Sequence, residues 1–318
     1  KEEKPIDWAR YTRAQTSEMS DYLLLVRALV DESERSLPKE RPGRGRPAKP
    51  AADLAKAILL QQYFQVGNRT AEGLAELFRE KLGIRSKLTY SDIARAYDDP
   101  RVLFLMRAVF DRTIEPIRAS EQALSIDGTG LPTSVKRNYE SDKGTEHAKQ
   151  YDMLIGMIGV RSKLFTAFEI TGAGSECPFL GPLLEESAQK LDCIELVTAD
   201  AAYLSRPNCN AIARIGAIPR IFPKRNTVLL RRGSQAWKDM LEALVEDAQQ
   251  WLREYHQRSI SESGNSVLKR RYPRPLLKRC DPKRRAEGCY RVVSYNVRML
   301  AYGFRLRGLN VPCLRQAG

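Results

Sequence analysis

The chain has 318 residues, 42% of them hydrophobic, and a formal net charge of +14 at neutral pH. This composition excludes an intrinsically disordered chain, and no apolar run reaches the roughly 18 residues that a membrane-spanning helix needs. The positive charge favours a polyanionic partner, of which nucleic acid and an anionic membrane surface are the usual classes. Six scattered cysteines without a C-x-x-C pair, and only two histidines, argue against a zinc site and fit a reducing cytoplasm.

The N-terminal part predicts a helix followed by a basic linker. Residues 1–36 carry leucines and valines at near-helical spacing, whereas residues 37–50, "LPKERPGRGRPAKP", break the pattern with Pro and Gly. Inside the linker, Arg44-Gly45-Arg46-Pro47 resembles an AT-hook, which binds the DNA minor groove. A solvated basic linker is the alternative interpretation of Arg44 and Arg46.

Three short helical patterns follow, and their tight connections suit a helix-turn-helix unit. Thr70 is predicted to cap the second helix and Ser91 the third. A small helical bundle without DNA contact explains the same patterns. Residues 1–120 are therefore expected to form an N-terminal helical domain, with helices over 52–65, 71–82 and 92–99.

From residue 121 the pattern changes to short apolar runs that end at Gly or Asp. Three strands come first, followed by helix, strand, helix, strand and then further helices. This order predicts an α/β fold, with a mixed sheet that is antiparallel at first, parallel later and covered by helices; an RNase H-like core has that order. Residues 121–318 are expected to form this second domain, with the helix over 290–308 packing back on the sheet.

Three carboxylates stand at positions suited to catalysis. Asp127 in "SIDGTG" and Asp200 in "VTADAAY" follow apolar strands, and Glu262 opens a later helix. Side chains at strand ends line the crevice of such sheets, and three carboxylates can hold two Mg²⁺ ions through hard oxygen ligands. Each also has a simpler interpretation: a turn Asp at 127, a helix cap at 200, and a capping box Ser259-x-x-Glu262.

An apolar stripe that starts at Trp237 and runs to Trp251 becomes polar further along the chain. The stripe continues in phase through Tyr255, Arg258, Glu262 and Lys269, which we call the signature residues. Ser259 and Gly264 are expected to interrupt the helix between them. An i, i+4 ion pair is the simpler interpretation of Arg258 and Glu262.

The spacing Tyr255-x2-Arg258-x3-Glu262-x6-Lys269 resembles, without gap or substitution, the Y-R-E-K signature of prokaryotic insertion-sequence DDE transposases. Asp127 resembles the first catalytic Asp of these proteins and Asp200 the second. The resemblance covers roughly residues 121–310, and residues 37–120 resemble the helical N-terminal domain of the same proteins. Some members insert a long β-rich domain between the second Asp and the Glu; here the expected helix, strand and helix fill that interval, so such an insertion is absent or very short.

The resemblance implies a DNA transposase that cuts transposon ends and joins the 3′-hydroxyl to target DNA by two-metal phosphodiester chemistry. Asp127, Asp200 and Glu262 would bind Mg²⁺, which Mn²⁺ can replace. The implied partner is double-stranded DNA, both terminal inverted repeats and target, bound by a homodimer in a synaptic complex in the nucleoid of a prokaryotic cytoplasm. Arg258 and Lys269 would contact phosphates, with Tyr255 stacking beside them.

The run "KRRYPRPLLKRCDPKRR" over 269–285 has nine basic residues and one acid. It predicts a surface that follows DNA phosphates, starting with Lys269, Arg270 and Arg271; a solvated face is the alternative. Two other functional classes also fit: a catalytically inactive or repurposed DNA-binding protein, and a metal-dependent nuclease that cuts without joining. Metal-dependent cleavage separates the first from a transposase, and strand transfer separates the second.

Overall fold

The computed structural model describes residues 7–37, 47–134, 151–172 and 174–315, which form two compact units. The sheet unit comprises residues 117–276, and the helical unit comprises residues 1–116 together with 277–318. The AT-hook residues Arg44 and Arg46 lie outside the described residues.

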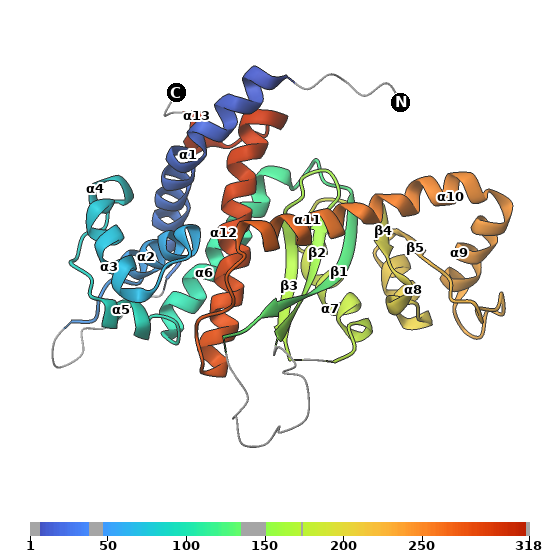
Figure 1. Cartoon of the computed structure of the whole chain (residues 1–318). Coiled ribbons are helices and arrows are strands. Elements are labelled where there is room, and N and C mark those ends of the chain that lie inside the picture. Colours follow the sequence, from blue (N-terminus) through green and yellow to red (C-terminus); the bar gives the residue numbers. More distant parts are fainter. Residues whose placement is uncertain (1–6, 38–46, 135–150, 173, 316–318) are drawn as a thin grey trace. The chain divides into compact units, whose positions relative to one another are not determined.

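The sheet unit contains a five-stranded mixed sheet in the order β3-β2-β1-β4-β5 (Figure 1). The β1–β2 and β2–β3 pairs are antiparallel, whereas β1–β4 and β4–β5 are parallel. This confirms the predicted RNase H-like order of antiparallel strands first and parallel strands later. The strands are β1 (Ala123–Pro132), β2 (Tyr151–Gly159), β3 (Phe165–Thr171), β4 (Leu196–Ala199) and β5 (Ile218–Ile221).

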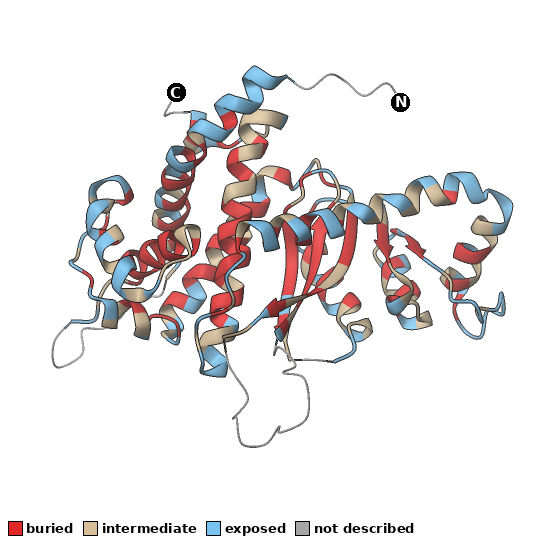
Figure 2. Ribbon diagram, viewed as in Figure 1, coloured by how far each residue is buried: buried red, intermediate tan, exposed pale blue. Residues whose placement is uncertain are grey.

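Helices cover this sheet in the predicted sequence order. α11 packs on β1 and β2, and α7 packs on β2 and β3. Figure 2 shows the buried strands beneath helices whose outer surfaces are exposed. The helices are α7 (Leu180–Ala188), α8 (Arg206–Arg214), α9 (Gln235–Glu246), α10 (Ala248–Tyr255) and α11 (Ser259–Arg271), with 3₁₀ turns η2 (Cys177–Phe179), η3 (Ala201–Tyr203) and η4 (His256–Arg258).

The helix expected to carry the apolar stripe and the signature residues is broken twice. Asp247 lies between α9 and α10, and its side chain accepts a hydrogen bond of 2.9 Å from the backbone N–H of Gln250, which caps α10. The second break is η4, which ends immediately before Ser259. The predicted interruption near Ser259 is therefore confirmed, while the one at Gly264 is wrong, because Gly264 is buried inside α11.

The helical unit includes the C-terminal helix α12 (Asp281–Arg307), which packs against α1, α2 and α6. The expectation that this helix packs back on the sheet is wrong. Buried hydrogen bonds join it to the helical unit: the Tyr22 hydroxyl lies 2.8 Å from the Ser294 hydroxyl, and the Asn296 amide donates to Thr113 at 2.9 Å. The other helices of this unit are α1 (Trp8–Glu34), α2 (Ala51–Phe64), α3 (Asn68–Leu77), α4 (Arg79–Leu82), α5 (Tyr90–Arg95), α6 (Pro100–Ile114) and α13 (Pro312–Arg315).

Two predicted caps in the helical unit are wrong. α3 begins at Asn68, so Thr70 lies inside it. α5 begins at Tyr90, and Thr89, not Ser91, caps it. Thr89 forms a capping box with Asp92, in which each side chain accepts a hydrogen bond from the other residue's backbone N–H. Within the described residues, neither unit contains a helix long and apolar enough to cross a bilayer.

Candidate active site

Asp127 and Asp200 occupy equivalent positions on two neighbouring strands. The last parallel pair between β1 and β4 joins Ser125 to Thr198, and each aspartate lies two residues beyond its member of that pair. In this parallel register the two aspartates stand at the same level, on strands that lie about 4.8 Å apart. β1 continues to Pro132 whereas β4 stops at Ala199, so the pair stands where the pairing of β1 with β4 ends.

Of the simpler interpretations of these two residues, the one for Asp127 is wrong and the one for Asp200 is confirmed. Asp127 lies in the interior of β1, so the turn interpretation is wrong. Asp200 does cap a helix: its Oδ1 accepts a hydrogen bond of 2.8 Å from the backbone N–H of Ala202 at the start of η3. That bond uses one of its two carboxylate oxygens and orients the carboxylate at the strand end.

Helix α11 is joined to β1 through polar contacts beside Asp127. The Ser125 hydroxyl donates to the Ser261 hydroxyl at 2.9 Å, and the Asn265 Nδ2 donates to Asp127 Oδ2 at 2.9 Å. Asn265 is only 4% exposed, and its Oδ1 has no hydrogen-bond partner. Glu262 lies on the same helix, next to Ser261 and three residues before Asn265.

The Glu262 carboxylate is half exposed and is paired with the Arg258 guanidinium. The i, i+4 ion pair is therefore present, while the capping box Ser259-x-x-Glu262 is not: Arg258 is the N-cap of α11 and makes no side-chain cap hydrogen bond. Burial lowers the pKa of Arg258, but the hydrogen bond that its guanidinium donates to Glu262 and the charges of Tyr255, Glu262 and Asp127 raise this pKa overall.

Tyr255 is fixed by aromatic neighbours. Its ring stacks on Trp251 with 5.3 Å between ring centroids and contacts Phe222 at 5.2 Å. Burial raises the pKa of the Tyr255 phenol, Arg258 lowers it, and the charges of Asp200 and Glu262 raise it again. The charge of Glu262 and that of one aspartate therefore act on each of the two side chains: Asp200 on Tyr255 and Asp127 on Arg258.

The remaining predicted phosphate contacts lie in the last turn of α11. Lys269 and Arg270 are exposed, and Arg271 is half-buried. Part of the basic run serves the helical unit instead: Lys278 donates to the Asn68 side chain at 2.7 Å, and its ammonium lies 3.9 Å from the centroid of the Tyr97 ring.

The electrostatics at Asp127 are unfavourable for an ionised carboxylate. Burial raises its pKa; the hydrogen bond from Asn265 and the charge of Arg258 lower it, and the charges of Glu176 and Asp200 raise it further, so the overall direction is upward. Carboxylates that repel one another in a partly buried place are compensated by a bound cation.

Asp127→Asn is therefore expected to stabilise the metal-free protein at neutral pH, by about 1 kcal/mol. A folded-state pKa above the unfolded value means that protonation stabilises the fold; this contribution is complete below the unfolded pKa and is lost as the pH rises through the folded pKa. The difference in unfolding free energy between the variant and the parent should therefore become smaller as the pH falls toward 4. Urea unfolding in EDTA at several pH values checks this, and a variant less stable than the parent at pH 7 contradicts it.

The described residues contain no group of three His, Cys, Asp or Glu side chains arranged closely enough to hold a metal ion. Each predicted ligand has a protein partner instead: Asn265 for Asp127, the η3 backbone for Asp200 and Arg258 for Glu262. The donor set nevertheless fits a hard divalent cation, because carboxylate oxygens are its preferred ligands and the negative charge at Asp127 lacks full compensation.

A fourth carboxylate, Glu176, was not predicted from the sequence. It precedes η2 and acts on the pKa of Asp127. The available signal was Gly128, since a glycine inside a strand often marks a close approach of another group to the backbone. A Cβ built at Gly128 would lie 2.2 Å from Glu176 Cδ.

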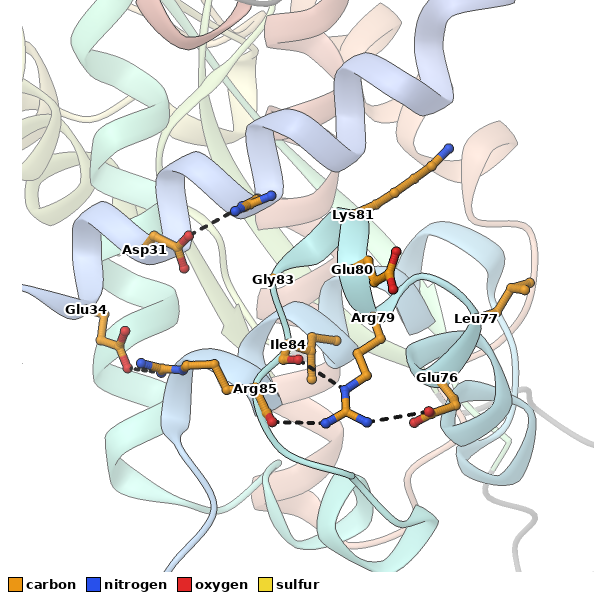
Figure 3. A pocket seen from close by; sticks show the side chains of 11 residues that line it. Asp31, Glu34, Glu76, Leu77, Arg79, Glu80, Lys81, Gly83, Ile84 and Arg85 are labelled. Atoms are coloured by element: carbon orange, nitrogen blue, oxygen red, sulfur yellow. Dashed lines mark hydrogen bonds and ion pairs between the residues drawn. The ribbon is translucent and has the colours of Figure 1, made fainter.

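The helical unit contains a separate hollow of about 940 Å³ with charged walls (Figure 3). Its charges neutralise one another: Arg85 pairs with Glu34 at 2.6 Å, and Arg79 pairs with Glu76 at 3.5 Å. These pairs differ from the like-charged carboxylates around Asp127. The hollow is therefore a place of structural ion pairs.

Comparison with known proteins identifies the relatives of this chain. Residues 118–296 match the family model described as "Transposase DDE domain". The chain is 28% identical, over 76% of its length and 72% of the relative, to the "Probable transposase for insertion sequence element ISA1214" of Archaeoglobus fulgidus. A cryo-EM structure of the piggyBac transposase synaptic complex with hairpin DNA shares the fold, with a TM-score of 0.50 and 11% identity over 94% of this chain and 78% of that one.

Proposed function

The chain belongs to the transposases with a DDE domain, whose family model matches more than half of its length, and from this premise we propose that Asp127, Asp200 and Glu262 are its catalytic carboxylates. A DNA transposase of this family depends on divalent metal; that the ion is Mg²⁺, replaceable by Mn²⁺, is part of the proposal. The observation that carries the assignment is the register of β1 and β4, which sets Asp127 and Asp200 at one level beside the helix that bears Glu262.

When bound, divalent ions activate the attacking oxygen and stabilise the leaving oxygen of a phosphodiester. The chain's own residues prepare this chemistry. Asn265 holds Asp127 in one orientation through the bond to Oδ2, and the η3 backbone does the same for Asp200. Glu262 would hold the ion together with these two aspartates, once its carboxylate is released from Arg258.

Arg258, once released, contacts a DNA phosphate, and Tyr255 stacks beside it on the platform of Trp251. Lys269, Arg270 and Arg271 extend these contacts along the last turn of α11. Together the signature residues set phosphate contacts next to a metal ligand, which a strand cut at a defined phosphodiester requires.

The helical unit is proposed to bind the terminal repeats, with Arg44 and Arg46 reaching the minor groove. Two copies of the chain would hold two transposon ends in a synaptic complex, in the nucleoid of a prokaryotic cytoplasm. The net charge of +14 supports extensive phosphate contact.

A strand-transfer assay tests the proposed function. The purified protein, Mg²⁺ and a DNA fragment ending in the inverted repeats that flank the gene are expected to give cut ends joined to a supercoiled target. Cutting without joining would favour the nuclease class, and binding without cutting would favour the inactive class.

Lys269→Ala is expected to weaken binding of transposon-end DNA and to reduce the slope of log affinity against log salt by about one unit, because one phosphate contact is lost. Lys269→Arg should partly restore affinity, since the charge is kept while its geometry changes. The matched control is Lys238→Ala on α9, where the lysine pairs with Glu242 at 3.1 Å. An unchanged salt slope for Lys269→Ala would show that this lysine is only solvated.

A further inference from the structure

The carboxylate of Glu176 occupies the place where a side chain at residue 128 would stand. A Cβ built at Gly128 would lie 2.2 Å from its Cδ and 2.3 Å from each of its two oxygens. Real Cβ atoms do not approach other atoms this closely, so any larger residue at 128 displaces the carboxylate. The absence of a side chain at Gly128 therefore makes room for Glu176 against the backbone of β1.

Glu176 approaches the candidate active site from the side opposite to α11. Ser125 and Asp127 contact α11, and successive residues of a strand point to opposite faces, so Gly128 faces the other way. At this level β1 has already lost its β4 neighbour, which ends at Ala199. No strand of the described sheet therefore pairs with this edge of β1 beyond the end of β4.

Tyr203 ties Glu176 to the turn that follows Asp200. The Tyr203 hydroxyl donates to Glu176 Oε2 at 2.8 Å, and Tyr203 itself is fully buried in η3. Burial raises the pKa of the Tyr203 phenol, and the charges of Glu176, Asp127 and Asp200 raise it further. The Tyr203 hydroxyl is thus bonded to one carboxylate, and the charges of two more act on its pKa. No described residue forms an ion pair with Glu176.

The buried amide of Asn265 adds an independent indication of a ligand. Its Nδ2 holds Asp127 while its Oδ1, enclosed by the protein, has no hydrogen-bond partner. Buried polar atoms are nearly always paired, so an unpaired one beside a carboxylate points to a missing group at this place.

We propose that Glu176 contributes a fourth carboxylate to the divalent-metal site, reaching it across Gly128 while α11 covers the opposite face. This inference rests on the proposed function, which assigns the metal to Asp127, Asp200 and Glu262. The Glu176 carboxylate would add negative charge and an oxygen donor beside Asp127, with Tyr203 fixing its orientation.

Mn²⁺ titration of the full-length protein by calorimetry, without DNA, measures this contribution. Glu176→Gln should weaken Mn²⁺ affinity at least about tenfold, within the range found when a group supporting a metal site is removed. The control is Glu169→Gln on the edge strand β3, an exposed carboxylate of the same unit, which should leave the affinity unchanged. Glu176→Gln should be as stable as the parent to urea in EDTA, since it keeps the size of the side chain and removes a repelling charge.

Gly128→Ala tests the same carboxylate without altering it. The new Cβ displaces Glu176, so this variant should lose Mn²⁺ affinity to the same extent as Glu176→Gln, and the double variant should lose no more than either single one. If Glu176 has only a structural role, these variants will instead be less stable in EDTA and will bind Mn²⁺ as tightly as the parent. That result would overturn the inference.

Asp127→Asn separates failure of this inference from failure of the proposed function. If Asp127→Asn abolishes Mn²⁺ binding while Glu176→Gln does not weaken it, the inference is wrong and the catalytic assignment stands. If neither substitution changes Mn²⁺ affinity, the metal binds elsewhere and both are wrong.

Discussion

Asp127→Asn and Glu262→Gln are each expected to lower Mg²⁺-dependent cleavage of transposon-end DNA by more than about a hundredfold, the upper end of what loss of a supporting group costs a metal site. Both changes remove a proposed metal-ligand charge and keep the size of the side chain. Affinity for the same DNA should be nearly unchanged, or higher, because a negative charge near the phosphates is gone.

The matched control for these variants is Asp192→Asn. Asp192 is a half-exposed carboxylate of the same sheet unit that pairs with Arg118 at 2.5 Å; it precedes the start of β4, whereas Asp200 follows the end of that strand. The Asp192→Asn variant should cleave transposon-end DNA at the parent rate. Parent-rate cleavage by Asp127→Asn or by Glu262→Gln would show that the metal is held by other residues.

Trp251→Ala is expected to destabilise the sheet unit by about 3–5 kcal/mol, the usual result of deleting a buried aromatic side chain. Trp251 is 1% exposed and contacts both the Tyr255 ring, stacked at 5.3 Å, and Phe222, at 6.2 Å between ring centroids. Its loss leaves a cavity under the end of α10 and removes the support of Tyr255. The midpoint of urea unfolding, followed by tryptophan fluorescence and circular dichroism, measures the effect.

Trp8→Ala is the control for that substitution, because Trp8 is 66% exposed at the start of α1. A surface change of this kind should stay within about 0.5 kcal/mol of the parent. An effect of Trp251→Ala below about 1 kcal/mol would mean that α9 and α10 add little to the stability of the sheet unit.

The order of strands and helices from residue 121 could be predicted because its signals are local. Apolar runs that end at Gly or Asp mark the strands, and the sequence order antiparallel then parallel follows from which connections are short and which carry a helix. The proximity of Asp127 and Asp200 follows from that order. The register of β1 against β4 could not be predicted, since no local signal in the sequence tells which residues of the two strands pair.

The signature residues show where periodicity alone is insufficient. Their spacing predicts one helical face, but Tyr255 ends α10, Arg258 lies in η4, and Glu262 and Lys269 lie in α11. Glu262 pairs with Arg258 without forming the capping box that its spacing with Ser259 suggests. The Glu262 carboxylate binds the side chain of Arg258, which belongs to η4, and not the start of its own helix α11.

Contacts between distant segments account for the other differences. The partners of the C-terminal helix α12, such as Tyr22 and Thr113, lie more than 180 residues away in sequence. Glu176 likewise carries no motif of its own, because its position depends on the space above Gly128. A glycine inside a strand is a signal of such an approach but does not name the group that approaches.

Anomalous scattering from Mn²⁺ in crystals of the protein with transposon-end DNA tests the catalytic assignment most directly. The assignment predicts an anomalous peak from Mn²⁺ ligated by oxygens of Asp127, Asp200 and Glu262. The ion pair between Glu262 and Arg258 should then be broken. A peak bound by other side chains, or a loaded metal with Glu262 still paired to Arg258, would contradict it.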